Sequence, residues 1–507
     1  MHRMPVWAVL ALVAAVLLGC SSSSSTDSVE VPPPRGNPPV GPPLVPPNGE
    51  PYADNFFENP GVNPFIDTAD DALSTFALDV DTASYAVARR YLSDGNLPDR
   101  DSVRVEEFVN AFPTGQDGPA TDAFAVRVDG GPSPFVQNQR YTMARVTVAS
   151  RAIARDERPD AALTFVIDVS GSMEMEGRLE LVKRSLERLL VELRPTDTVA
   201  IVVYGTDARV ILQPTPVVES DQIAGAIRQL RPEGSTNAEA GLVLGYEVAR
   251  AAFRPGGVNR VILASDGVAN VGNTGADAIL RQIRDEAAAG ITLLTLGVGM
   301  GNFNDVLMER LANDGDGFYA YVDTIDEAER LFGTELTSTL VTIALDAKIQ
   351  VEFDPAAVER YRLIGFENRA VDDDRFRDDT VDAGAIGAGH QVTALYELLL
   401  TDGGAGPLGT VHLRWTDPAT GEAEELRQPF AADALASSYA ETDPHFQLAT
   451  TVAAFGEVLR GSIWAQGYSL DDVAVQAATL GDQLGDSSVV ELADLTRRAA
   501  ALAGVDE

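Results

Sequence analysis

Residues 162–172 read ALTFVIDVSGS. Their first half is a short, mostly apolar run, which is typical of a strand buried on both faces of a parallel sheet. The second half places the carboxylate of Asp168 and the hydroxyls of Ser170 and Ser172 on a loop made tight by Gly171. Because ligands of open α/β sheets gather outside the C-terminal ends of the strands, this loop is a candidate binding site.

Strand-like and helix-like segments then alternate as far as about residue 340. The alternation predicts an α/β fold, with a doubly wound, mostly parallel sheet covered by helices on both faces. We assign this central domain to residues 159–342. Its predicted strands are 162–167, 198–204, 210–212, 258–264, 292–298 and 317–321. Its predicted helices are 177–193, 222–230, 238–253, 276–289, 304–312 and 325–340.

The flanks of the central domain are richer in strands. Strand-like segments lie on both sides of it, at 124–128, 141–148, 348–353, 394–400 and 410–416. We infer one β-rich domain that is split in sequence, with the α/β domain inserted between its halves. Two unrelated domains in a row are the alternative. Apolar residues at helical spacing predict C-terminal helices at 446–459 and 489–502.

The composition excludes several classes of protein. The 507 residues include 38 Lys and Arg against 76 Asp and Glu, and the formal net charge of −38 repels phosphate backbones, so we expect no nucleic-acid partner. One cysteine rules out a disulfide framework, and four histidines leave little room for a histidine-rich metal site. The sequence lacks Gly-x-x-x-x-Gly-Lys-Ser/Thr, so we expect no nucleotide bound through that motif.

The first twenty residues have the features of a secretion signal. The apolar run 6–18 is too short for a permanent membrane span, which needs about 20 residues. It ends in Leu-Leu-Gly-Cys, which resembles the bacterial lipobox, so we interpret 1–20 as a lipoprotein signal peptide with Cys20 as the lipidation site. An ordinary secretory signal is the alternative. The Ser- and Pro-rich segment 21–52 cannot build a core and predicts a tether.

An anchor and tether of this kind place the body of the protein outside the cytoplasm, in a bacterial cell envelope. Ser21 follows the cysteine, and the absence of Asp at that position resembles the signal for the outer membrane of Gram-negative cells. We therefore expect a protein held on a membrane by lipid.

Two further polar loops belong to the same candidate site. Residues 233–237 (Glu-Gly-Ser-Thr-Asn) open a predicted helix, and residues 264–267 (Ala-Ser-Asp-Gly) end a predicted strand. Both would converge with the first loop at one edge of the sheet. Carboxylate and hydroxyl oxygens are hard ligands of the kind that Mg²⁺, Mn²⁺ and Ca²⁺ take. The alternative is that these Ser and Asp residues only cap helices.

Together the three loops resemble the metal-ion-dependent adhesion site of von Willebrand factor type A (VWA) domains. That site has Asp-x-Ser-x-Ser, then Gly-Ser-Thr-Asn, then Ser-Asp-Gly, as here. By this resemblance the metal ligands are Asp168, Ser170, Ser172, Thr236 and Asp266. The resemblance implies a divalent cation, with Mg²⁺ favoured over Mn²⁺ and Ca²⁺, and an open coordination position. A protein partner would offer a carboxylate to that position.

The resemblance extends to the flanks. LSTFALDVDTASY at 73–85 and VRVEEFVN at 103–110 are similar to the N-terminal segment of YfbK-like bacterial lipoproteins, and YRLIGFENR at 361–369 to their C-terminal domain. By this resemblance the body divides into an N-terminal von Willebrand factor-associated domain (53–158), the VWA domain (159–342) and a C-terminal β-rich and helical domain (343–507).

Two other acidic stretches have a cation-binding and a structural interpretation. The first comprises Asp79, Asp81, Thr82 and Ser84, which could hold a second cation or cap a predicted helix at 83–92; we favour the cap. The runs 372–374 and 378–379 could bind Ca²⁺ or form a solvated, charged loop, and we favour the loop.

Three hypotheses of function remain: a binding module, a metal-dependent hydrolase, and an envelope scaffold whose metal only stabilises the fold. Hydrolysis requires a base and a charge stabiliser near the metal, yet the three loops contain neither His nor Lys. No nucleophile elbow, Gly-x-Ser-x-Gly, surrounds a candidate serine. We therefore predict a membrane-anchored binding protein and not an enzyme. Partnership with an ATPase chaperone is a further alternative, since some bacterial relatives of the central domain work in such systems.

Overall fold

The computed structural model describes residues 55–78, 80–135, 140–267, 276–300, 303–402 and 406–504. All of them belong to one compact unit, Pro43–Glu507. The predicted signal peptide (1–20) with Cys20, the predicted tether (21–52) and Asp79 lie outside the described residues. Within the described residues, no helix combines the length and the apolar character that a membrane span needs.

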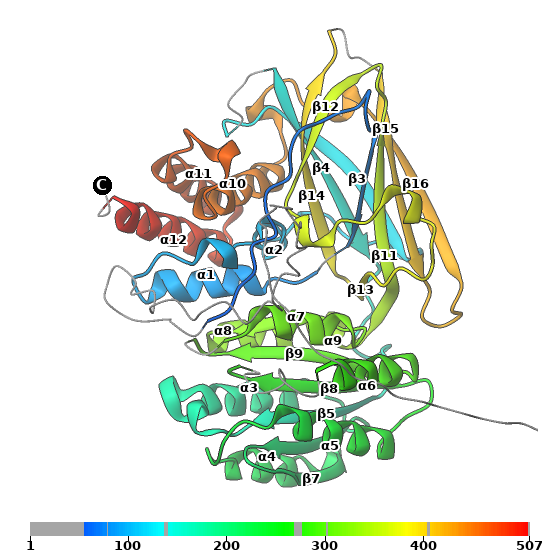
Figure 1. Cartoon of the computed structure of the whole chain (residues 1–507), viewed down its shortest axis with the longest axis vertical. Coiled ribbons are helices and arrows are strands. Elements are labelled where there is room, and N and C mark those ends of the chain that lie inside the picture. Colours follow the sequence, from blue (N-terminus) through cyan, green and yellow to red (C-terminus); the bar gives the residue numbers. More distant parts are fainter. Residues whose placement is uncertain are drawn as a thin grey trace, which may run out of the picture. The chain divides into compact units, whose positions relative to one another are not determined.

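A six-stranded sheet forms the central domain, in the order β10-β9-β8-β5-β6-β7 (Figure 1). Its strands are β5 (Ala161–Asp168), β6 (Thr198–Tyr204), β7 (Ala208–Pro216), β8 (Val258–Ser265), β9 (Thr292–Val298) and β10 (Tyr319–Val322). Neighbours are parallel except β6 and β7, which are antiparallel. Every residue of β5 is buried, as its apolar run predicts. The predicted α/β class with a mostly parallel sheet is confirmed.

Helices cover this sheet on both faces. They are α3 (Arg178–Glu192), α4 (Ser220–Gln229), α5 (Ala238–Ala251), α6 (Ala276–Ala288) and α7 (Asp305–Asn313). Successive residues of β5 pack into different cores, because their side chains point to opposite faces. Phe165 and Ile167 share a core with residues of α3 and α4, whereas Val166 shares one with residues of α5 and α7.

The strand order reverses at β5, and this reversal places the candidate site. β5 pairs with β6 on one side and with β8 on the other. The C-terminal ends of β5 and β8 therefore border the crevice in which doubly wound sheets bind ligands. Asp168 is the last residue of β5, and Ser265 is the last residue of β8.

The segment predicted as a single helix at 325–340 is helical except at Glu335, but it is not one regular α-helix. It consists of α8 (Ile325–Glu329), a π-helical turn (Arg330–Thr334) and α9 (Leu336–Leu340). Gly333 and Thr334 are poor helix formers. The hydroxyl of Thr339 also donates to the carbonyl oxygens of Leu331 (3.0 Å) and Glu335 (2.9 Å), and side-chain bonds of this kind bend helices.

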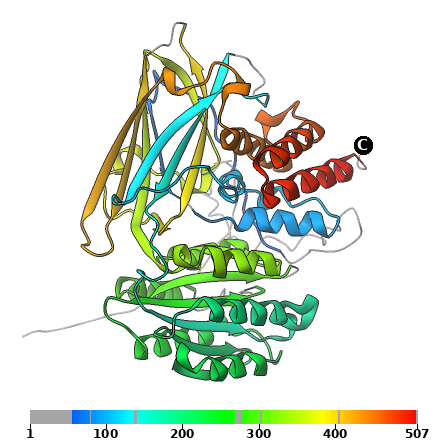
Figure 2. The ribbon, with the colours of Figure 1, turned by 180° about the vertical axis from the view of Figure 1, so that it is seen from behind.

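Two further sheets form a β-sandwich (Figure 2). One has the order β1-β12-β14-β4-β3, with β1 (Ile66–Asp67), β12 (Val358–Ile364), β14 (Gln391–Leu400), β4 (Tyr141–Ser150) and β3 (Phe124–Gly131). The other has the order β13-β11-β15-β16, and β2 also pairs with β11. Its strands are β13 (Gly384–Gly387), β11 (Thr342–Phe353), β15 (Pro407–Thr416), β16 (Ala423–Ala431) and β2 (Leu73–Ala77).

Each sheet of the sandwich contains strands from both flanks of the central domain. β4 pairs with β14, and β2 pairs with β11. Aromatic contacts join the two sheets: the ring of Phe353 stacks on Tyr361 with 4.5 Å between centroids, and Phe124 meets Trp415 at 4.9 Å. The split β-rich domain with an inserted α/β domain is therefore the arrangement found. The sequence pattern missed β16, an edge strand whose polar residues hide the alternation.

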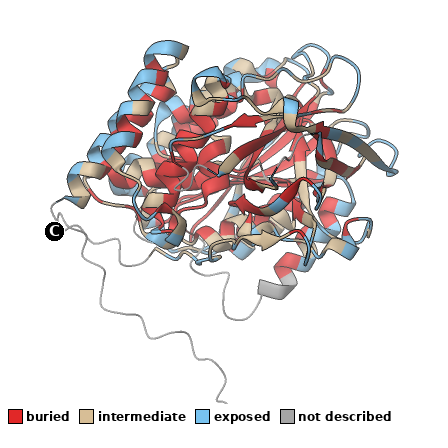
Figure 3. Cartoon of the chain, turned by 90° about the horizontal axis from the view of Figure 1, so that it is seen from above, coloured by how far each residue is buried: buried red, intermediate tan, exposed pale blue. Residues whose placement is uncertain are grey.

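A helical layer combines N-terminal and C-terminal segments. It contains α1 (Ala83–Ser93), α2 (Val105–Asn110), α10 (Pro444–Leu459), α11 (Leu470–Leu484) and α12 (Ser487–Ala503). Residues from all five share one core, and Figure 3 shows the buried faces of the helices turned inward. The sequence pattern missed α11, whose buried face includes the small residues Ala474, Ala477 and Gly481 and so gives a weak periodic signal.

Candidate functional site

Asp168 is held rigidly at the end of β5. Its side chain is fully buried, and its Oδ1 accepts a hydrogen bond of 2.8 Å from the backbone N–H of Ser170. Its Oδ2 accepts one of 3.0 Å from the hydroxyl of Ser265, at the end of β8. The hydroxyl oxygens of Ser170 and Ser172 lie 3.0 Å apart. The structure thus places two hydroxyls beside a fixed carboxylate.

The charge of Asp168 is poorly compensated. Burial, together with the nearby carboxylate of Asp266, raises the pKa of its carboxyl to about 6, although the hydrogen bonds from Ser170 and Ser265 act in the opposite direction. A buried carboxylate whose pKa is raised in this way gains from a cation nearby.

The loop that carries Thr236 is tied to the first loop. The N–H of Gly171 donates to the carbonyl of Gly234 at 3.2 Å, and the N–H of Glu233 donates to the carbonyl of Val169 at 2.5 Å. Gly234 has a φ of +76°, and a Cβ there would collide with Thr206. Thr236 itself is half-buried. The glycine therefore allows the close approach that brings this loop to the sheet edge.

One residue of this loop also caps a helix. The Oδ1 of Asn237 accepts a hydrogen bond of 3.2 Å from the N–H of Ala240 in the first turn of α5. The helix-cap interpretation therefore applies to Asn237, which is not among the five predicted metal ligands.

Asp266 has a partner that the sequence analysis missed. The side chain is buried one residue beyond β8, and its Oδ2 accepts a hydrogen bond of 2.7 Å from Nη1 of Arg178. Arg178 is the first residue of α3, where the helix dipole disfavours a positive charge. A cation at the N-terminus of the helix that follows the first loop was the signal that could have identified it.

The donor set fits a hard divalent cation. Asp168 and Asp266 supply buried carboxylates, and Ser170, Ser172 and Thr236 supply hydroxyls on loops at the same sheet edge. In the described part of the chain, no three His, Cys, Asp or Glu residues group together as a metal site. A site built on two carboxylates and three hydroxyls is of a different kind, because its hydroxyls add oxygen ligands without adding negative charge.

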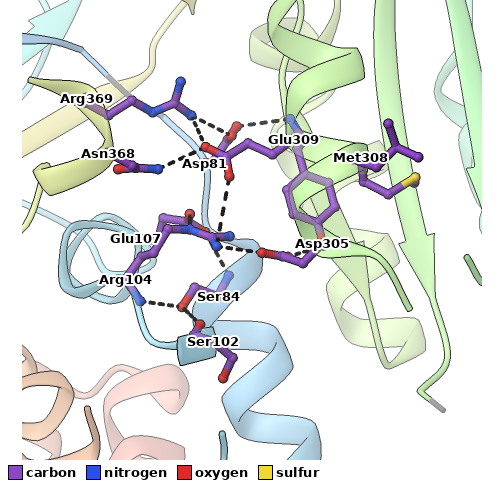
Figure 4. A network of polar contacts seen from close by, with 12 residues as sticks. Asp81, Ser84, Ser102, Arg104, Glu107, Asp305, Met308, Glu309, Asn368 and Arg369 are labelled. Atoms are coloured by element: carbon purple, nitrogen blue, oxygen red, sulfur yellow. Dashed lines mark hydrogen bonds and ion pairs between the residues drawn. The ribbon is translucent and has the colours of Figure 1, made fainter. Parts of the chain in front are cut away.

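The second oxygen-rich stretch joins parts of the chain to one another (Figure 4). Asp81 is buried; its Oδ1 accepts a bond of 3.0 Å from the N–H of Tyr319, and its Oδ2 lies 3.4 Å from Nη2 of Arg369. The hydroxyl of Ser84 donates to the carbonyl of Ser102 at 2.6 Å and accepts from the N–H of Arg104 at 2.9 Å. Protein donors and acceptors thus use these oxygens.

The helix cap predicted for this stretch comes from another element. Thr82 stands at the N-cap of α1 without a side-chain capping bond. Instead, Oε2 of Glu107, on α2, accepts a hydrogen bond of 2.7 Å from the N–H of Ser84. In the acidic runs, Asp379 pairs with Arg414 at 2.8 Å, so part of their charge is balanced by arginine.

Sequence profiles identify the class of protein that this fold and site define. The profile described as "von Willebrand factor type A domain" matches residues 162–334, and one described as "von Willebrand factor" matches residues 51–143. The profile described as "Uncharacterized protein YfbK, C-terminal" matches residues 338–502. The chain is a VWA-domain protein; domains of this type generally bind a divalent metal and often mediate protein interactions.

The relatives identify the family. The chain is 39% identical over 438 residues to YfbK of Escherichia coli (strain K12), which covers 81% of this chain and 75% of that protein. It therefore belongs to the YfbK family. It is also 26% identical over 365 residues to protein sll0103 of Synechocystis sp., covering 69% of this chain and 82% of that protein. Among solved structures, the von Willebrand factor type A protein from Catenulispora acidiphila aligns with a TM-score of 0.44 and 17% identity, covering 73% of this chain and 89% of that one.

Proposed function

We propose that this chain is a lipid-anchored envelope protein that binds a protein partner through a divalent cation. The observation that carries the proposal is the meeting of Asp168, Ser170, Ser172 and the buried Asp266 where the strand order of the VWA sheet reverses. The predicted anchor at Cys20 would hold the body outside the cytoplasm on a bacterial membrane, with the outer membrane favoured in a Gram-negative cell.

Each side chain has a separate task in this proposal. Asp168 is fixed by Ser170 and Ser265, so its carboxylate is preorganised for a cation. The hydroxyls of Ser170, Ser172 and Thr236 add oxygen ligands without adding negative charge. The cation, with Mg²⁺ favoured and Mn²⁺ or Ca²⁺ as alternatives, supplies a Lewis-acidic position that attracts a carboxylate of the partner.

Binding is favoured over catalysis by the chemistry of the loops. None of the three loops carries a His or Lys that could act as a general base or acid. The nearby Arg178 is engaged by Asp266. We therefore propose a binding protein and no enzymatic activity. An envelope scaffold with a structural metal, or a partner of an ATPase chaperone, are the alternatives.

Calorimetric titration of Mg²⁺, Mn²⁺ and Ca²⁺ into the full chain, with Asp168→Ala beside the wild type, tests the proposal. We expect saturable binding in the wild type and none in the variant, whose circular dichroism should be unchanged. A partner captured from envelope extracts should be released by EDTA and lost with the variant. Equal heats in both proteins would mean diffuse ion binding by the acidic surface, and retention of the partner by Asp168→Ala would overturn the mechanism.

A further inference from the structure

The buried guanidinium of Arg178 needs an explanation of its own. It is paired with Asp266, and the two side chains are only 3% and 1% exposed. Burying an ion pair costs the desolvation of both groups, and an apolar pair of similar volume is often no less stable. A structural role alone is therefore a weak reason for a cation beside a candidate metal ligand.

The surroundings are built to hold this guanidinium in place. Its Nη2 donates to the carbonyl oxygen of Met300. The preceding residue, Gly299, has a φ of +75°, and a Cβ at this position would collide with the side chain of Arg178. Glycine thus supplies the space, and Asp266 and Met300 fix the orientation of the side chain.

The positive charge of Arg178 changes the net charge with which the site meets a cation. Asp168, Asp266 and Arg178 together carry one net negative charge. Among nearby charged groups, the half-exposed Glu176 lies 4.0 Å from Nη2 of Arg178 and 3.2 Å from Arg90, which also pairs with Asp94 at 2.7 Å; Arg209 pairs with Glu233. A divalent cation would then leave the site with one net positive charge, whereas without Arg178 the two carboxylates would neutralise the cation.

We infer that Arg178 makes cation binding and carboxylate capture interdependent. Its positive charge lowers the affinity of the site for a divalent cation alone. It raises the affinity for a cation that carries one carboxylate, because the site, the cation and the carboxylate are then electrically neutral together. The inference rests on the proposed function and specifies its ligand as a single carboxylate group. Arg178 acts through Asp266 and the local charge, so it is a positioning residue.

Titrations of Mg²⁺ in sodium acetate and in sodium chloride of equal ionic strength test this inference, with acetate as the carboxylate probe. For the full-length wild type, we expect acetate to tighten Mg²⁺ binding about fivefold. For Arg178→Gln, we expect binding about tenfold tighter in chloride, because a repelling charge is gone, and no further gain from acetate. A residue with a purely structural role would not change the response to acetate.

The matched control is Arg209→Gln, which removes an exposed positive charge at the rim of the site without touching Asp266. We expect it to keep the wild-type response to acetate. If Arg178→Gln does not fold, Arg178→Lys replaces it: the charge remains, so the acetate response should remain. Loss of that response in Arg178→Lys would overturn the inference.

Failure of the inference differs from failure of the proposed function. If the wild type binds Mg²⁺ but Arg178→Gln shows the same affinity and the same response to acetate, the coupling role of Arg178 is wrong and the cation site stands. If the wild type shows no saturable binding in either salt, the proposed function itself is wrong.

Discussion

Two oxygen-rich stretches of this chain look alike in sequence but have different surroundings in the structure. At the end of β5, Asp168 is followed by Ser170 and Ser172, whose hydroxyls lie together at the sheet edge. At the start of α1, Asp81 and Ser84 form hydrogen bonds with donors and acceptors of the protein (Figure 4).

The comparison teaches that a cluster of oxygens is not by itself a cation site. Around Asp81, each carboxylate meets protein donors: Asp305 accepts from Arg104 at 2.5 Å and from the hydroxyl of Tyr319 at 2.9 Å, and Glu309 pairs with Arg369 at 2.8 Å. At the sheet edge, Asp266 pairs with the guanidinium of Arg178, whereas Asp168 accepts hydrogen bonds only from neutral donors, the N–H of Ser170 and the hydroxyl of Ser265. We call the region around Asp81 the junction. It comprises Asp81, Ser84, Arg104, Glu107, Asp305, Glu309 and Arg369.

The largest effect is expected at the junction. Arg104→Gln should lower the free energy of unfolding by about 3–5 kcal/mol, because it leaves the buried carboxylates of Glu107 and Asp305 without their cation. Chemical denaturation measures the change, and Mg²⁺ affinity of the folded protein should be unaffected. The exposed Arg127→Gln serves as a control and should change stability by less than about 0.5 kcal/mol. A loss of Mg²⁺ affinity in Arg104→Gln would contradict the assignment of a structural role to the junction and of cation binding to the sheet edge.

A substitution of carboxylate by amide should act with opposite sign in the two regions. Burial raises the pKa of Asp168 to about 6, so without metal its charge costs stability above that pH. Asp168→Asn should therefore raise the free energy of unfolding at pH 7 by at most about 3 kcal/mol. The gain should vanish as the pH falls from about 6 to about 4, because the wild-type carboxyl then takes up a proton.

At the junction, Asp81→Asn should lower the free energy of unfolding by about 1–3 kcal/mol, because an amide nitrogen would face the donors of Tyr319 or Arg369. Denaturation of both variants in metal-free buffer between pH 4 and pH 8 measures the two effects. The same sign for both substitutions at pH 7 would contradict the comparison.

The smallest effect is expected from the hydroxyls. Ser172→Ala should weaken Mg²⁺ binding about tenfold, or about 1.4 kcal/mol, because one uncharged ligand is lost. Ser84→Ala should leave Mg²⁺ affinity unchanged and lower stability instead, because its buried partners Ser102 and Arg104 lose a hydrogen bond each. Calorimetry and denaturation of both variants separate the two roles. Equal Mg²⁺ affinities of Ser172→Ala and the wild type would show that Ser172 is not a ligand.

Local patterns in the sequence predicted the strands and most helices of the central domain and the polar composition of its three loops. Apolar runs such as β5 signal a doubly covered strand, and the three polar loops follow strands or open helices at predictable ends. Where local signals were weak, prediction failed: the small residues of α11, the polar edge strand β16 and the broken helix at 325–340 were missed or misjudged.

Periodicity therefore determined the α/β class, because it is a property of neighbouring residues, and the resemblance of three short loops to the VWA adhesion site implied the five candidate ligands. Tertiary structure alone decided which oxygens are paired with cationic side chains of the protein and which are candidates for binding a metal ion. Arg178 and Asp266 are 88 residues apart, and Asp81 and Tyr319 are 238 apart. The partner of a buried charge is set by the packing of elements that are distant in sequence, and a local pattern of residues does not identify that partner.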